Sequence, residues 1–153
     1  MQEGGRMTLY EFKQELFVIR ENRRVMRSLR QSLATLEEDM LTSVFSGAID
    51  YSKDKVQHQS DPDSAIINAI MLTEKEKERL RRQLAELQEE NAELEKLIYS
   101  MRGVGAEIVR LYFIEGKTMI DIAKRLGYHR DTCYEKWNNT IKDMLEVYEN
   151  GKA

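Results

Sequence analysis

Apolar residues recur at helical spacing along most of this chain, and turn-forming residues divide the pattern into segments. Between Thr8 and Met40 the apolar positions form a seam that shifts phase near Asn22 and then resumes, which predicts one long amphipathic helix. Thr8 and Glu11 have the residue types and spacing of a capping box, so this helix is expected to begin there. Alternation typical of strands is not convincing in any segment, and the predicted fold class is all-α.

A long connection is predicted after this helix. Residues 43–60 contain Ser or Gly at five positions, which favours a loop between the first long helix and the next. Asp61 and Pro62 then have the residue types of an N-cap and a first helical position. A second long helix is therefore expected from Pro62 to about Met101.

The second helix carries an apolar seam with spacings of four and three residues, interrupted by one amide. The seam positions are Leu80, Leu84, Leu87, Asn91, Leu94, Ile98 and Met101. A buried Asn at such a position commonly fixes the register of a two-stranded coiled coil, so one interpretation is a parallel homodimer. The flanking charges support it unevenly, since Glu76 would face Arg81 but Glu90 would face Glu95. Packing against the chain's own first helix, as an αα-hairpin, is the main alternative, and an antiparallel or higher assembly is a third.

Residues 103–148 predict three helices joined by two short turns, forming a domain separate from residues 8–102. The first helix ends at Gly116, and Thr118 offers an N-cap hydroxyl to a short second helix that ends at Gly127. The third runs from Arg130 to Tyr148, and its apolar face is made of Cys133, Trp137, Thr140, Ile141 and Met144. A short helix, a glycine turn and a longer helix form the arrangement of a helix-turn-helix, whose second helix enters the major groove of DNA.

The stretch IVRLYFIEGKTMIDIAKRLGYHRDTCYEKW resembles the region-4 helix-turn-helix of sigma-70-type transcription factors. With the long helices before it and the segment KDKVQHQSDPDS, the chain also resembles the small phage-encoded late-transcription regulators of the RinA/ArpU kind. The resemblance implies a regulator that binds promoter-proximal double-stranded DNA in the cytoplasm of a bacterial host, with RNA polymerase as a further partner. His129 departs from the motif, which usually has Ser or Thr there, and Lys136 stands where an aliphatic residue is usual.

The candidate DNA contacts fall into two groups. The face of the third helix opposite its apolar side is expected to reach base edges through Arg130, Tyr134 and Asn138. Side chains near the turn and the helix ends are expected to contact phosphates, and they are Lys117, Thr118, Lys124, His129 and Lys136. The arginines between positions 20 and 30 are interleaved with Glu21 and apolar residues, which favours a solvated helix face.

The net charge of −3 is unevenly distributed along the chain. Residues 61–102 hold seven Lys/Arg and ten Asp/Glu, whereas residues 103–145 hold seven and six. The candidate DNA-binding segment is therefore only slightly basic. Because phosphate neutralisation supplies most non-specific affinity, one copy is expected to bind weakly, and a homodimer or docking on a larger DNA-bound machine would compensate.

Catalytic and metal chemistry have no support in the sequence. No Gly-rich phosphate loop and no Ser/His or Cys/His arrangement has catalytic spacing, and neither His58 nor His129 has further ligands at metal spacing. One Cys, no signal peptide and no long apolar run predict a cytoplasmic chain without membrane contact, cofactor or small-molecule substrate. The alternatives to a regulator are a phage terminase small subunit, which is a DNA-packaging adaptor, and a helical protein–protein interaction module without DNA binding.

Overall fold

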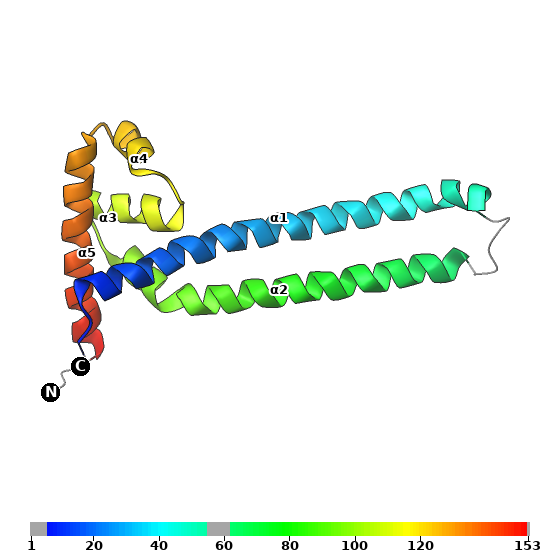
Figure 1. The fold of residues 1–153 in the computed structure, drawn as a ribbon, viewed down its shortest axis with the longest axis horizontal. Helices are drawn as coiled ribbons and strands as arrows, with labels where there is room; N and C mark the ends of the chain where they lie inside the picture. The colour runs from blue at the N-terminus through cyan, green and yellow to red at the C-terminus, as the bar shows by residue number, and fades with distance from the viewer. Residues whose placement is uncertain (1–5, 55–61, 153) are drawn as a thin grey trace. The chain divides into compact units, whose positions relative to one another are not determined.

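The computed structural model describes residues 6–54 and 62–152, and at residues 43–54, 62 and 152 it describes the backbone alone. All regular secondary structure among these residues is helical, which confirms the all-α prediction (Figure 1). The elements are α1 (Leu9–Asp54), α2 (Pro62–Ser100), α3 (Val104–Val109), the π-helical turn η2 (Arg110–Ile114), α4 (Met119–Leu126) and α5 (Arg130–Lys152). They form two compact units: Met1–Val25 with Leu87–Ala153, and Met26–Glu86. Helices α1 and α2 each contribute to both units.

Helix α1 begins as the sequence predicts and ends later. The Thr8 amide donates to Glu11 Oε1 at 2.9 Å and the Glu11 amide donates to Thr8 Oγ1 at 3.1 Å, which is the reciprocal capping box. The loop predicted at 43–60 is wrong over residues 43–54, because α1 continues to Asp54. Isolated Ser and Gly cost a helix at most about 1 kcal/mol each relative to Ala, and no Pro interrupts this stretch. Residues 55–61, which include the predicted cap Asp61, lie outside the described residues.

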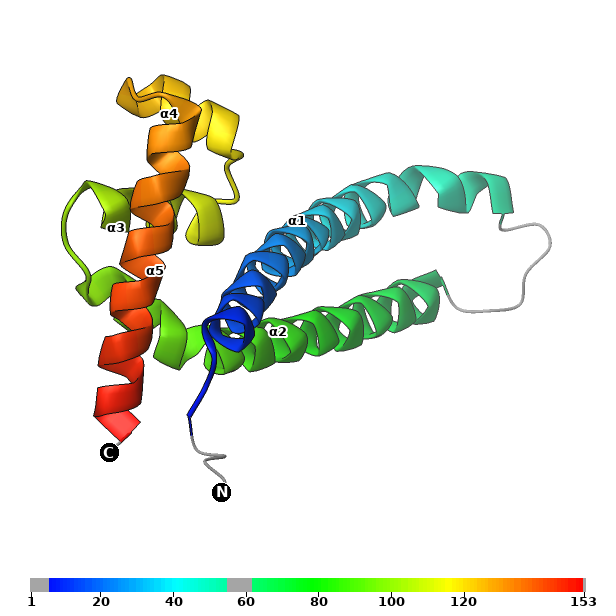
Figure 2. The same cartoon turned by 60° about the vertical axis from the view of Figure 1, so that its left-hand side comes forward.

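The core of the unit formed by Met1–Val25 and Leu87–Ala153 joins the long helices to the shorter ones. Phe12 and Leu16 of α1 and Ile98 of α2 are fully buried in one cluster with Phe113 and Ile141. The expected division at residue 102 therefore differs from the compact units, because residues 103–148 share their core with the beginning of α1 and the end of α2. Figure 2 shows the first turns of α1 beside α5 within this unit.

Helix α2 lies beside the chain's own α1, which runs in the opposite direction (Figures 1 and 2). Leu80, Asn91, Leu94 and Ile98 are buried, and Leu84 and Leu87 are half-buried. The Asn91 side chain is 1% exposed, accepts a hydrogen bond from Asn22 Nδ2 at 3.0 Å and donates to Glu95 Oε2 at 3.2 Å. The αα-hairpin interpretation thus describes the pairing in this structure, and the amide at position 91 is satisfied within one chain.

Candidate nucleic-acid interface

Helix α4 is short because both of its ends are fixed by specific residues. At the N-terminus, Thr118 is extended and its Oγ1 accepts a hydrogen bond from the Asp121 amide at 3.2 Å. At the C-terminus, Gly127 takes the left-handed conformation (φ 77°, ψ 26°), and the amides of Gly127 and Tyr128 both donate to Ala123 O. Glycine adopts this conformation without strain, so the chain reverses here and enters α5 after His129.

The preceding turn is closed in a similar way. Gly116 has a φ of 75°, and the Lys117 amide donates to Leu111 O at 3.0 Å. This hydrogen bond spans six residues, one more than the 6→1 bond of a Schellman motif, because the helix before Gly116 ends in the π-helical turn η2. Helix α4 is therefore preceded and followed by fixed glycine turns, as the sequence predicted.

Helix α5 buries the face that the sequence predicted. Cys133, Trp137, Ile141 and Met144 are buried, and Thr140 is half-buried. Helix α3 crosses α5 closely at Gly105, where an added Cβ would lie 2.0 Å from Thr140 Oγ1. This face is therefore committed to packing, and contacts with a ligand would have to come from the remaining surface of α5.

His129 caps α5. Its Nδ1 accepts a hydrogen bond from the Asp131 amide at 3.2 Å, which is the contact an N-cap hydroxyl would make. This geometry gives a physical reason for the departure from Ser or Thr at this position, because the imidazole supplies the acceptor instead.

An aromatic cluster surrounds Trp137. Phe113 is stacked on its ring with centroids 5.7 Å apart, and Tyr112 meets it edge-on at 5.4 Å. Lys13 of α1 places its Nζ 5.3 Å from the ring centroid, which is a cation–π contact. The indole Nε1 is buried and has no hydrogen-bond partner among the described residues. Trp137 thus joins η2, α5 and α1 at the centre of this unit.

The three predicted base-contacting residues do not share one environment. Arg130 is exposed at the start of α5, and Tyr134 is 43% exposed with its ring edge-on to Trp137 at 6.0 Å. Asn138 is half-buried, and its Oδ1 accepts a hydrogen bond from Lys13 Nζ at 2.7 Å. The expectation that Asn138 lies on a free outward face is therefore wrong, because α1 packs alongside α5 at this level.

The predicted phosphate contacts also divide by environment. Lys117 and Lys124 are exposed, and Lys136 is half-buried with its Nζ 5.6 Å from the centre of the Tyr128 ring. Thr118 and His129 are exposed but use a side-chain acceptor to cap a helix. Lys117 and Lys124 therefore keep ammonium groups accessible beside the start of α4 and within it, and the two caps fix backbone amides at the beginnings of α4 and α5.

Two arginines have structural contacts that the sequence did not suggest. Arg20 donates from Nε to Tyr112 O at 2.9 Å and from Nη2 to Gly116 O and Lys117 O at 3.3 and 3.2 Å. Arg23 donates from Nε to Ile114 O at 3.3 Å and from Nη1 to Glu95 at 3.1 Å. The interpretation of these arginines as a solvated face is wrong, because both bind carbonyls at the end of η2. The carbonyls that they bind lie 91 to 97 residues away in the sequence, and no local pattern marks them.

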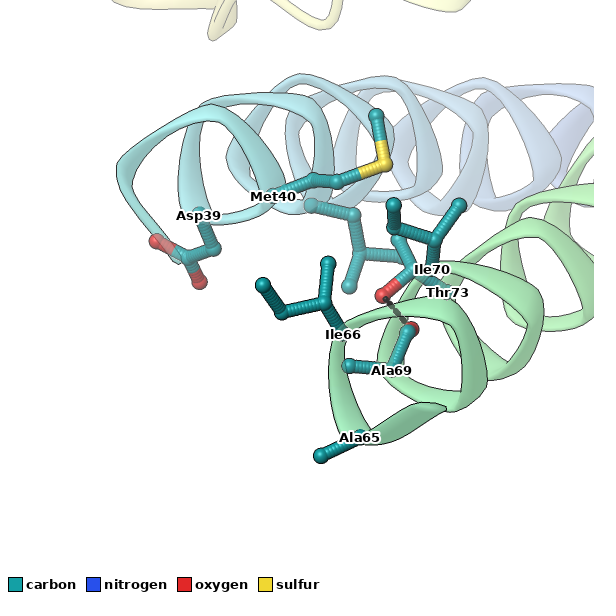
Figure 3. Close-up of a pocket in the computed structure, with 8 residues that line it drawn as sticks. Asp39, Met40, Ala65, Ile66, Ala69, Ile70 and Thr73 are labelled. Atoms are coloured by element: carbon teal, nitrogen blue, oxygen red, sulfur yellow. Dashed lines mark hydrogen bonds between the residues drawn. The ribbon is translucent and has the colours of Figure 1, made fainter. Parts of the chain in front are cut away.

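A groove lies within the unit Met26–Glu86. It has a volume of about 210 Å³ and lies between α1 and α2, as Figure 3 shows. Its lining residues are Leu36, Asp39, Met40, Ala65, Ile66, Ala69, Ile70 and Thr73. The Thr73 hydroxyl donates to Ala69 O at 2.9 Å within the helix. The lining is mainly aliphatic and supplies no pair of groups for acid–base or nucleophilic chemistry.

The described residues hold no group of three or more His, Cys, Asp or Glu side chains that could bind a metal ion. Burial raises the pKa of the Cys133 thiol, an effect that the positive charge of Lys136 partly opposes. A buried thiol that stays protonated is not a nucleophile. The described helices include no segment with both the length and the apolar character needed to cross a bilayer.

Comparisons of the chain with protein-family models, with curated proteins and with solved structures found no match.

Proposed function

We propose that this protein is a sequence-specific DNA-binding transcription regulator of phage or prophage origin that acts in the cytoplasm of a bacterial host. The observation that supports it best is the α4–α5 pair, in which a capped short helix, a left-handed glycine turn and a helix with an exposed beginning follow one another. In a helix-turn-helix protein, the second helix presents its N-terminal residues to the major groove while the first crosses the phosphate backbone. Helix α5 would be the recognition helix.

Exposed charges around the start of α5 support weak binding by one copy. Lys117, Lys124 and Arg130 are exposed, and so are Asp131 and Glu135. The carboxylates reduce the surplus of positive charge that would neutralise phosphates. A second copy, or RNA polymerase bound at the same promoter, would raise the effective concentration at the DNA and compensate.

Within this proposal, Arg130 and Tyr134 read base edges and Lys117 and Lys124 bind phosphates. Arg130 would donate to the two acceptors of a guanine in the major groove, which is the commonest specific contact of arginine. Asn138 would contribute only if its Oδ1 exchanged Lys13 for a base, so its role is secondary to that of Arg130. Thr118 and His129 would act through the amides that they hold in place.

The test is selection of bound sites from fragmented phage and host DNA with the full chain. Enrichment of promoter-proximal sequences is expected. Enrichment of a packaging site would favour the terminase small subunit instead, and no enrichment would favour a module for protein contacts alone.

Two substitutions separate the proposed roles. Arg130→Ala should cost about 1–3 kcal/mol of binding free energy at the preferred site and lower discrimination among sequences. Lys117→Ala should weaken binding to all sequences alike and make log affinity against log salt shallower by about one unit. Arg79→Ala, which removes the same charge from an exposed Glu76-paired position of α2, is the control and should change neither quantity. Loss of thermal stability in Arg130→Ala would mean that α5 is oriented differently from this assignment.

A further inference from the structure

The guanidinium of Arg20 gathers three backbone carbonyls from the turn before α4. Besides its bonds to Tyr112 O, Gly116 O and Lys117 O, it lies 4.3 Å from the centre of the Tyr112 ring. The last carbonyls of a helix have no N–H donor within that helix, so they need hydrogen-bond donors from elsewhere. Arg20 supplies those donors from a helix that lies outside the α4–α5 pair.

Two of these carbonyls belong to the peptide planes on either side of Lys117. The planes are fixed when their oxygens are bonded, because a peptide unit is rigid. The Lys117 amide is held from the other direction by Leu111 O. The direction in which the Lys117 side chain leaves the backbone, and the entry into the Thr118 cap, therefore depend on Arg20.

We infer that Arg20 is a positioning residue for DNA binding, an inference that rests on the proposed function. Its Nε and Nη2 are bonded to carbonyls, so these donors are committed to the turn. It acts through Lys117, whose ammonium group it directs towards a phosphate. The α4–α5 pair consequently needs the N-terminal part of α1 for its full affinity.

Lysine at position 20 would keep the charge and lose the geometry. A guanidinium is planar and presents several donors in a fixed fork, whereas an ammonium is a point charge on a flexible stem. Arg20→Lys therefore separates a positioning role from a simple contribution of positive charge. The matched control is Arg24→Lys, because Arg24 lies on the same helix and its ion-pair partner is the neighbouring Glu21.

The experiment is a DNA titration of the full chain at several salt concentrations. Arg20→Lys should make log affinity against log salt shallower by about one unit, which corresponds to roughly an eightfold loss at 0.1 M salt if the ionic contribution vanishes near 1 M. Arg24→Lys should leave both values unchanged. Equal affinity of Arg20→Lys and the wild type would overturn the inference and leave the proposed function intact.

A double-substitution cycle tests whether Arg20 acts through Lys117. In a Lys117→Ala background, Arg20→Lys should have little further effect, because the contact that it positions is already absent. If Arg20→Lys lowers the affinity by the same factor in the Lys117→Ala background as in the wild type, the inference is overturned.

Amide hydrogen exchange gives a readout that does not need DNA. In Arg20→Lys, exchange should rise at Lys117 and stay slow at Ile141, whereas faster exchange at both would indicate a role in the fold alone and also overturn it. Absence of binding by the wild type at every salt concentration would refute the proposed function, and the positioning role would fall with it.

Discussion

Gly105→Ala tests the closest approach between α3 and α5. An alanine Cβ at this position would lie 2.0 Å from Thr140 Oγ1, 3.0 Å from Lys136 O and 3.3 Å from Thr140 Cβ. A rotation of Thr140 about χ1 would move the first atom away. It would not move the other two, so α3 and α5 would have to separate by a few tenths of an ångström.

Two opposing effects determine how much Gly105→Ala lowers the free energy of unfolding. Overpacking of a well-packed contact costs about 1–3 kcal/mol, and the fixed backbone oxygen places this site in the upper part of that range. Alanine regains up to about 1 kcal/mol over glycine within a helix. The expected net destabilisation is about 1–2 kcal/mol, which corresponds to a lower Tm by about 2–8 °C for a chain of this size.

Thermal and urea unfolding of three variants would measure this effect. Gly105→Ala should lose stability, and its loss should shrink when Thr140→Ala removes the nearest atom. Gly151→Ala is the control, because Gly151 is helical and a Cβ there meets nothing within 4 Å. If the stability of Gly105→Ala matches that of the wild type in both measurements, then α3 does not approach α5 as closely as described.

Three further substitutions test the core and the caps. Trp137→Ala should lower the free energy of unfolding in urea by about 3–5 kcal/mol, because it removes a ring that is 6% exposed. Trp137→Phe should cost much less, since it keeps an aromatic ring and removes an unpaired N–H. Equal losses in the two variants would contradict the packing around the indole. Asn91→Leu should cost about 1–3 kcal/mol because the Asn22 amide loses one of its two acceptors, and adding Asn22→Leu should restore part of this loss. Light scattering on the same samples checks that the state of association is unchanged, as expected for a seam paired within one chain. Thr118→Ala should cost about 1 kcal/mol through loss of the N-cap, and a Thr118→Ser control that loses as much would argue against the cap.

The sequence predicted those features that depend on neighbouring residues. The capping box of Thr8, the cap of Thr118 and the left-handed Gly127 each follow from residue types within a few positions, and all three have the expected geometry. The buried face of α5 followed from spacing alone. The predicted loop at 43–60 shows the limit of this reasoning, because Ser and Gly only lower helix stability slightly and do not determine where a helix ends.

Features that depend on residues distant in the sequence could not be predicted. Asn138 has the polar character of a recognition residue, but Lys13, 125 positions away, binds its side chain. The role of Gly105 depends on Thr140, and nothing near Gly105 in the sequence indicates which helix would cross there. In both cases the residue type was compatible with several environments, and the tertiary packing of α1 and α3 against α5 selected one.

The phase shift of the α1 seam near Asn22 has a structural reason that links these observations. Up to Ile19, α1 buries apolar residues in the cluster that contains Phe113 and Trp137. At the shift, Asn22 binds Asn91 and Arg23 binds both Ile114 O and Glu95, so a polar layer replaces the apolar one. The compact unit changes directly afterwards, between Val25 and Met26. An uninterrupted apolar repeat would pair α1 with α2 but would leave the carbonyls at the end of η2 without donors. The polar residues that interrupt the apolar pattern of α1 therefore attach the segment before α4 to the long helices.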